Sequence, residues 1–142
     1  MPDDSLPLEL RLGLRAGSVY YFQSRELTSP EPHFFVVVNR DPIGTKRVFL
    51  TIVTSKVEAV RRRNRDRPET FIEISPTDYD ELTVHSAIDC NVVVEKPLSE
   101  LAGMVQRKEV RYHRHLPPEI FTKLKAGIDA SPVVEDEIRE LL

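Results

Sequence analysis

The sequence predicts an α+β domain in which a small β-barrel of about five to seven mainly antiparallel strands is followed by C-terminal helices. Three observations support this fold class. Apolar runs rich in valine and phenylalanine crowd the first two thirds of the chain, and the clearest helical periodicity lies at its end. Strands also do not alternate regularly with helices, which argues against a parallel sheet.

The length of 142 residues predicts one domain with one core. Within it we expect an N-terminal arm (1–16), a β-barrel core (17–115) and C-terminal helices (116–142). A composition of 40% hydrophobic and 30% charged residues is typical of a globular domain rather than a disordered one.

The strands are predicted from β-branched and aromatic runs and from alternating polarity. Leucines of the arm are expected along a sheet edge: Leu10, Leu12 and Leu14. Strands are expected at 17–23, 33–39, 47–54, 70–75 and 85–94, with a long loop at 24–32. The strands at 33–39 and 47–54 are joined by a short loop, which predicts an antiparallel hairpin at the centre of the core. In the last strand, a period of two places Ile88, Cys90, Val92 and Val94 on one face and Asp89 and Asn91 on the other.

Helices are predicted from capping residues and from apolar spacing. One short helix is expected at 55–64 with Ser55 as N-cap, and another at 98–105. A longer helix begins near Pro118 and stacks Ile120, Phe121, Leu124 and Ile128 on one side. A last helix is expected to begin at Ser131 as N-cap and Pro132 at the first helical position.

Several classes of protein are excluded by what the sequence lacks. The single cysteine, Cys90, permits no intramolecular disulfide and favours a reducing compartment, so we expect a cytoplasmic protein in which this thiol packs in the core. No run of 18 apolar residues is present, so no membrane span is expected. The scattered glycines form no phosphate-binding loop, and we expect no cofactor. His113 and His115 have cationic neighbours, so an exposed basic loop is expected there rather than a metal site.

Charge is unevenly distributed although the net charge is only −3. Residues 61–67 hold five arginines and one aspartate, and residues 105–115 hold Arg107, Lys108, Arg111 and Arg114. Such segregation predicts a local basic surface on an acidic protein. Solvated loops and helix faces account for the same runs, so both interpretations stay open.

Polar side chains lie where predicted strands begin, end or expose one face. His33 begins the first central strand, Thr54 and Ser55 end the second, and Asp89 lies on a later strand. In a small barrel such strand ends meet at one rim, and the group would supply an imidazole, hydroxyls and a carboxylate. These suffice for attack by a ribose 2′-hydroxyl on a phosphodiester. A strand-start residue, a helix cap and a solvated carboxylate explain the same residues without chemistry.

From Gly17 to about Leu101 the order of these segments resembles the PemK/MazF-like toxins, small SH3-like barrels that act as ribonucleases in toxin–antitoxin pairs. GSVYYF resembles the opening GxVYY strand of that family and HFFVVVN resembles its RPVLVxxN strand. VFLTIVTS resembles its strand ending in a Thr-Ser pair. SAIDCNVVVEKPLSEL resembles the later strand that leads into a short helix.

The resemblance implies metal-independent cleavage of single-stranded RNA, a homodimer with an RNA groove, and a cognate antitoxin. It implies catalytic roles for His33, Thr54, Ser55 and Asp89, and base stacking by Tyr112 or Phe71. It further implies RNA binding by Arg61, Arg62, Arg63, Arg65, Arg111 and Arg114.

Two positions depart from the family pattern. His33 stands where the family has an arginine before proline, and Val94 stands at its second arginine, where valine cannot stabilise transition-state charge. Asp89, His85 or an arginine of 61–67 or 107–114 would have to substitute. The alternative is a non-catalytic relative that acts as a protein- or nucleic-acid-binding module.

Overall fold

A computed structural model describes residues 6–24 and 31–142 of the chain. The start of the predicted arm and most of the predicted loop at 24–32 therefore lie outside the described residues. The structure contains one seven-stranded sheet in which β6 and β5 both pair with the same edge of β3, and the remaining order is β4-β5-β3-β2-β1-β7. The strands are β1 (Val19–Phe22), β2 (His33–Val37), β3 (Arg47–Thr54), β4 (Phe71–Ile74), β5 (Ser86–Asp89), β6 (Val94–Pro97) and β7 (Arg111–His113).

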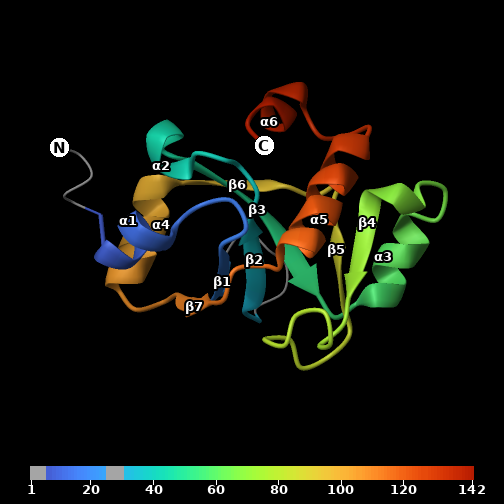
Figure 1. The fold of residues 1–142 in the computed structure, drawn as a ribbon, viewed down its shortest axis with the longest axis horizontal. Helices are drawn as coiled ribbons and strands as arrows, with labels where there is room; N and C mark the ends of the chain where they lie inside the picture. The colour runs from blue at the N-terminus through green and yellow to red at the C-terminus, as the bar shows by residue number, and fades with distance from the viewer. Residues whose placement is uncertain (1–5, 25–30) are drawn as a thin grey trace.

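Every strand pair is antiparallel, and helices lie on both faces of the sheet (Figure 1). The α+β class and the antiparallel sheet are confirmed. The predicted barrel is open, because the end strands β4 and β7 do not pair with each other in the described part of the chain. Instead, the helix α5 (Pro118–Ala130) packs its apolar side on one face of the sheet.

The helices are α1 (Leu8–Gly13), α2 (Pro42–Thr45), α3 (Val57–Arg63), α4 (Leu98–Gln106), α5 (Pro118–Ala130) and α6 (Asp136–Glu140), with a 3₁₀ turn, η2 (Pro68–Thr70). The predicted helices at 55–64, 98–105 and from Pro118 are confirmed. Among the described residues, no helix combines the length and the apolar character that crossing a membrane requires.

The predicted central hairpin is formed by β2 and β3, with Phe34 opposite Val53 and Val37 opposite Leu50. Alternate side chains of these strands enter two separate apolar clusters. Val36 and Val53 pack under α5, whereas Val37 and Leu50 pack under α1 and α4. Both faces of the hairpin are therefore buried, which explains why its sequence is almost continuously apolar.

The expectation that the arm lies along a sheet edge is wrong. Residues 8–13 form α1, which packs beside α4 (Figure 1). Leu10 and Leu14 are buried, but Leu12 is 74% exposed. This pattern follows the helical spacing of four residues rather than the period of two that a strand would require.

The expected strand at 85–94 is broken into β5 and β6. Oδ1 of Asp89 accepts a hydrogen bond from the backbone N–H of Asn91 at 3.0 Å, and this local bond turns the chain. Because of this turn, the residues after it no longer alternate between the same two faces as those before it. Cys90 packs under α5, whereas Val94 packs in the opposite cluster and Val92 is exposed.

Both predicted serine caps are wrong. The N-cap of α3 is Lys56, without a side-chain hydrogen bond, and the last helix begins at Asp136 behind Glu135. The Ser131 hydroxyl oxygen accepts hydrogen bonds from the backbone N–H groups of Val133 and Val134, but no helix starts there. The same hydroxyl donates to Oδ1 of Asn91 at 2.5 Å. This contact ties the end of α5 to the turn that follows β5.

Gly127 of α5 lies directly against Cys90, and this contact predicts a conditional effect on stability. A Cβ at position 127 would lie 2.5 Å from the Cys90 Sγ, which is itself fully buried. Gly127→Ala is therefore expected to lower the free energy of unfolding by about 1–3 kcal/mol. In a Cys90→Ala background the loss is expected to be smaller, because only the Cβ of residue 90, at 3.1 Å, remains close. Urea unfolding of the four variants measures this, and an equal loss in both backgrounds would disprove the contact.

Candidate functional site

The start of β2 and the end of β3 meet at one edge of the sheet. Phe34 pairs with Val53 in antiparallel register, so the preceding residue of β2, His33, and the following residue of β3, Thr54, are neighbours. A hollow of about 220 Å³ opens there. Its polar lining residues are Tyr21, Glu31, His33, Thr54, Ser55, Lys56, Thr83 and Ser86. Three of the four predicted catalytic residues therefore share one site.

The His33 side chain is half-buried, and its Nδ1 atom is buried without a hydrogen-bond partner in the described part of the chain. Buried nitrogen atoms are almost always paired, so an unpaired one is an outlier that calls for an explanation. The His33 ring as a whole lines the hollow, so the imidazole stands where a bound ligand would lie.

Residues 54–56 form a tight turn that places two hydroxyls and a cation at the hollow. Oγ1 of Thr54 accepts a hydrogen bond from the backbone N–H of Lys56 at 3.1 Å. Ser55 and Lys56 are exposed, and Lys56 forms no ion pair with any described residue. Sequence reasoning missed Lys56, although its position directly after the Thr54-Ser55 pair was the available signal. The site thus holds a cation that the predicted set lacked.

Asp89 does not share this hollow. It lies on β5, where Ala87 pairs with Thr54, so Asp89 is two residues farther from the edge and is buried beneath α3. Its carboxylate binds Arg63 at 3.1 Å and Asn91 at 2.9 Å. Burial by itself raises the pKa of Asp89, but the hydrogen bonds from Asn91, Asn64 and Arg63 outweigh it and hold the pKa below its usual value. The expectation of one shared pocket is corrected for this residue.

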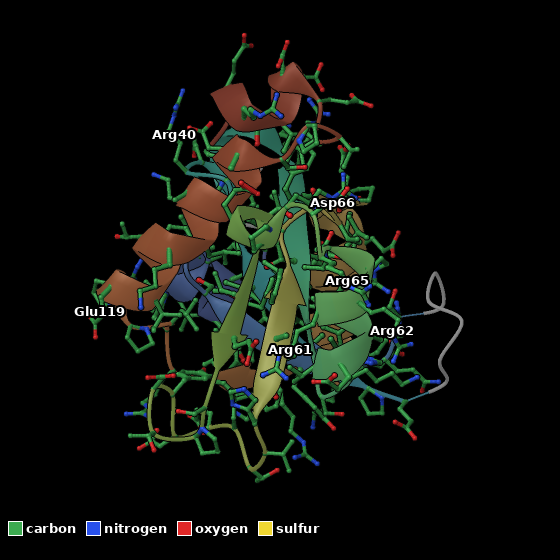
Figure 2. All side chains as sticks on the ribbon, turned by 90° about the vertical axis from the view of Figure 1, so that its right-hand side faces the viewer. Arg40, Arg61, Arg62, Arg65, Asp66 and Glu119 are labelled. Atoms are coloured by element: carbon green, nitrogen blue, oxygen red, sulfur yellow. The ribbon has the colours of Figure 1, made fainter. Side chains whose placement is uncertain are left out.

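The predicted RNA-binding arginines differ in their freedom to bind phosphate. Arg61 binds Glu58 and Glu73, Arg63 binds Asp89, and Arg114 binds Asp80 and Glu81. Figure 2 shows Arg61 and Arg62 on α3 and Arg65 just beyond it. Arg62 and Arg65 are exposed and have no ion pair with a described residue. Their charge therefore faces solvent beside the segment that carries Lys56.

The pair of Arg61 with Glu73 predicts a pH-dependent contribution to stability. Hydrogen bonds from Arg61 and then His85 lower the pKa of Glu73 from 4.5 to about 2. A lowered carboxyl pKa stabilises the folded state above pH 4.5, and this stability is lost as pH falls toward 2. Glu73→Gln is therefore expected to cost about 1 kcal/mol at pH 7, because the pair is only partly buried. The difference should vanish near pH 2 in urea unfolding, and a constant difference at all pH values would refute it.

Cys90, His113 and His115 make packing or hydrogen-bond contacts within the fold. Burial raises the pKa of the Cys90 thiol to about 12, so it is protonated at neutral pH and is a poor nucleophile. The ring of His113 packs against Phe34, with 4.8 Å between the ring centroids, whereas His115 bonds the Ser18 hydroxyl at 3.1 Å. The described residues contain no group of three or more His, Cys, Asp or Glu side chains arranged to hold a metal ion.

Comparison with known proteins identifies the fold. No protein-family model and no curated protein sequence matches the chain. Among solved structures, an endoribonuclease in complex with its cognate antitoxin from Mycobacterial species is similar, with 15% identity and a TM-score of 0.51 over 83% of this chain and 92% of that chain. MazE-MazF from Deinococcus radiodurans is similar with 9% identity and a TM-score of 0.54 over 83% of this chain and 94% of that chain. The chain has a MazF-like fold.

This MazF-like fold confirms the family resemblance at the level of structure and clarifies one departure from the family pattern. Val94, which the resemblance placed at an arginine position, pairs with Leu50 and packs under α1 and α4. It does not line the hollow of His33. The positive charge at this MazF-like edge comes from Lys56, which follows β3 directly.

Proposed function

We propose that this chain is the toxin of a toxin–antitoxin pair and that it cleaves single-stranded RNA without a metal ion at the hollow of His33. The observation that carries the proposal is the meeting of the His33 imidazole, two hydroxyls and the Lys56 ammonium group at one edge of a MazF-like sheet. These groups cover the needs of phosphodiester transesterification, which are a proton acceptor and donor and charge stabilisation.

In the proposed reaction, His33 accepts the proton of a ribose 2′-hydroxyl while that oxygen attacks the adjacent phosphorus. The bond from phosphorus to the 5′-oxygen breaks, and the imidazolium returns its proton to this leaving oxygen. The products are a 2′,3′-cyclic phosphate and a 5′-hydroxyl, so no water or cofactor is consumed. Lys56 and the hydroxyls of Thr54 and Ser55 stabilise the charge on the phosphoryl oxygens in the transition state.

Asp89 is assigned a positioning role in this proposal. Its ion pair with Arg63 holds α3 against β5, and α3 begins directly after Lys56. Arg62, Arg65 and Arg111 are the arginines available for phosphate contacts. Arg61, Arg63 and Arg114 already bind carboxylates, so their contribution to RNA affinity is proposed to be smaller.

The partners follow from the same proposal. The similar mycobacterial endoribonuclease is described in complex with its cognate antitoxin. We infer a cognate antitoxin for this chain, a homodimer with an RNA groove, and a cytoplasmic location, where its RNA substrate is found. A non-catalytic binding module was suggested by Val94, but Lys56 supplies a cation at the hollow and so removes the main reason for that alternative.

Expression in a bacterial host tests the toxin role. Production of the chain alone is expected to arrest growth, and co-expression of the proposed cognate antitoxin is expected to restore growth. The His33→Ala variant, produced at the same level, is the matched control and should permit growth. Unimpeded growth with the soluble wild-type chain would contradict the proposal.

A further inference from the structure

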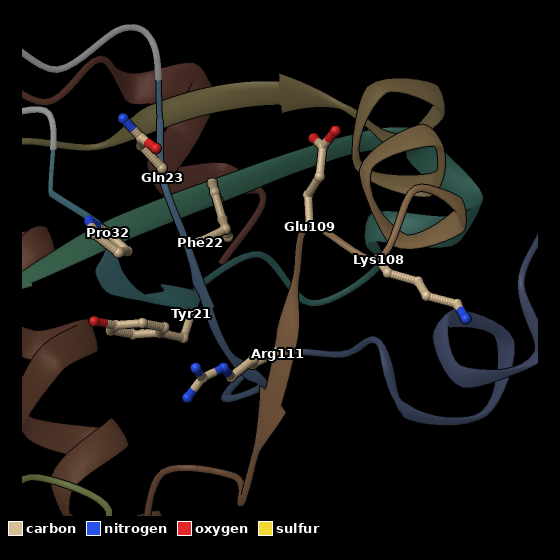
Figure 3. Close-up of a pocket in the computed structure, with 7 residues that line it drawn as sticks. All are labelled: Tyr21, Phe22, Gln23, Pro32, Lys108, Glu109 and Arg111. Atoms are coloured by element: carbon tan, nitrogen blue, oxygen red, sulfur yellow. The ribbon is translucent and has the colours of Figure 1, made fainter.

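A second, larger hollow adjoins the site of His33. It has a volume of about 470 Å³ and is lined by Tyr21, Pro32, Arg111 and Lys108, among others (Figure 3). Tyr21 and Pro32 also line the hollow of His33, so the two hollows share a wall. A volume of this size lies in the range of small-ligand sites in proteins. The two hollows are therefore neighbours, separated by the wall that Tyr21 and Pro32 form.

The wall between the hollows is built from neighbouring strands. Tyr21 of β1 pairs directly with Arg111 of β7, so their side chains lie on the same face of the sheet. The Arg111 guanidinium lies 5.7 Å from the centre of the Tyr21 ring. Figure 3 shows the two side chains close together, with Lys108 at the far end of the hollow.

Two cations of the second hollow have no carboxylate partner among the described residues. Arg111 and Lys108 are exposed and form no ion pair with any residue of 6–24 or 31–142. The carboxylate at this hollow, Glu109, is bound by Arg107 at 2.8 Å. An aromatic ring beside free cations is the combination by which proteins bind single-stranded nucleic acid, with bases against the ring and phosphates on the cations.

We propose that the second hollow is a subsite for the nucleotide next to the scissile phosphate. Its base lies against Tyr21 and Pro32, and its phosphate binds Arg111, with Lys108 at the outer end. This inference rests on the proposed function, because the shared wall is what makes the two nucleotides adjacent. Tyr21 takes the stacking role in place of Tyr112 and Phe71, because Tyr21 lines both hollows and the other two line neither.

Binding of a non-cleavable RNA tests the subsite separately from catalysis. The probes are 2′-O-methyl oligonucleotides of two to six nucleotides with a fluorescent label, measured by anisotropy at several salt concentrations. For the hexamer, Arg111→Gln is expected to raise the Kd about tenfold, as for a charge-assisted phosphate contact. It should also reduce the slope of log K against log salt by about 0.7, the value for one phosphate contact to a single strand.

Two controls make the result specific. Lys125→Gln removes one charge from α5, lines neither hollow, and should leave both Kd and salt slope unchanged. Arg111→Lys should retain most of the salt slope. The wild type should lose affinity stepwise as the probe is shortened, and Arg111→Gln should remove one of these steps. A hexamer Kd within twofold of the wild type for Arg111→Gln, or an equal effect of Lys125→Gln, would overturn the subsite.

The outcome is independent of whether the chain is a nuclease. A wild type that binds the hexamer through Arg111 but cuts no cleavable RNA would contradict the proposed function and support the subsite. A wild type that cuts RNA but binds the hexamer equally well without Arg111 would support the proposed function and contradict the subsite. A wild type that does not bind the hexamer at all would overturn the subsite, and its cleavage assay would decide the function.

Discussion

Replacement of His33 by alanine is expected to lower the rate of RNA cleavage by about 10²–10⁴-fold, the usual contribution of a positioned acid–base group. The reason is that His33 is the one described imidazole at the hollow, beside Thr54 and Ser55. Single-turnover cleavage of an unstructured RNA, with enzyme in excess, measures the chemical step. Full activity of His33→Ala would remove His33 from the mechanism.

The fold of this variant should remain intact. The buried Nδ1 of His33 has no hydrogen-bond partner in the described residues, so its removal breaks no internal hydrogen bond. Circular dichroism and thermal unfolding should therefore match the wild type closely. His85→Ala is the matched control, because His85 is exposed, binds Glu73 and does not line the hollow. Its cleavage rate should stay within about twofold of the wild type, since surface changes away from a site have small effects.

Replacement of Lys56 by glutamine is expected to lower the cleavage rate by about 10²-fold, the cost of losing one group that stabilises transition-state charge. Lys56 is exposed and has no carboxylate partner among the described residues, so its charge is available to a phosphoryl group. The rate at saturating RNA separates this effect from weaker binding.

The charge itself can be tested with a conservative variant. Lys56→Arg should retain a substantial part of the rate, whereas Arg62→Gln, which removes a charge one turn or more along α3, should raise KM in preference to lowering kcat. Equal rates for Lys56→Gln and the wild type would show that the positive charge at the hollow plays no part in the chemistry.

The central strands were predictable because their sequence leaves little choice. β3 spans Arg47–Thr54, the predicted range, since a hairpin buried on both faces must be apolar at nearly every position. α5 was predictable because its apolar residues recur at helical spacing behind Pro118. The segment 85–94 was not, because periodicity does not reveal that Asp89 will accept a hydrogen bond from the backbone of Asn91 and turn the chain.

The candidate site was predictable where antiparallel pairing alone decides position. His33 and Thr54 meet because one begins β2 and the other ends β3. The predicted position of Asp89 was wrong because it depends on the turn after β5 and on the ion pair with Arg63. The ion pairs of Arg61 and Arg114 were also not predicted. Their partners, Glu73 and Asp80, are distant in sequence and become neighbours only in the folded chain. Lys56 was not predicted as a site residue because an isolated lysine in a sequence is nearly always a solvated surface residue.

The most direct measurement is cleavage of an unstructured RNA by the purified wild-type chain in excess chelator, with a substrate that carries one 2′-deoxyribose at the cut position as its control. The account predicts cleavage of the all-ribose strand, a 2′,3′-cyclic phosphate or its hydrolysis product at the new end, a 5′-hydroxyl on the other fragment, and an intact control strand. An uncut all-ribose strand, or equal cleavage of the strand with the 2′-deoxyribose, would contradict it.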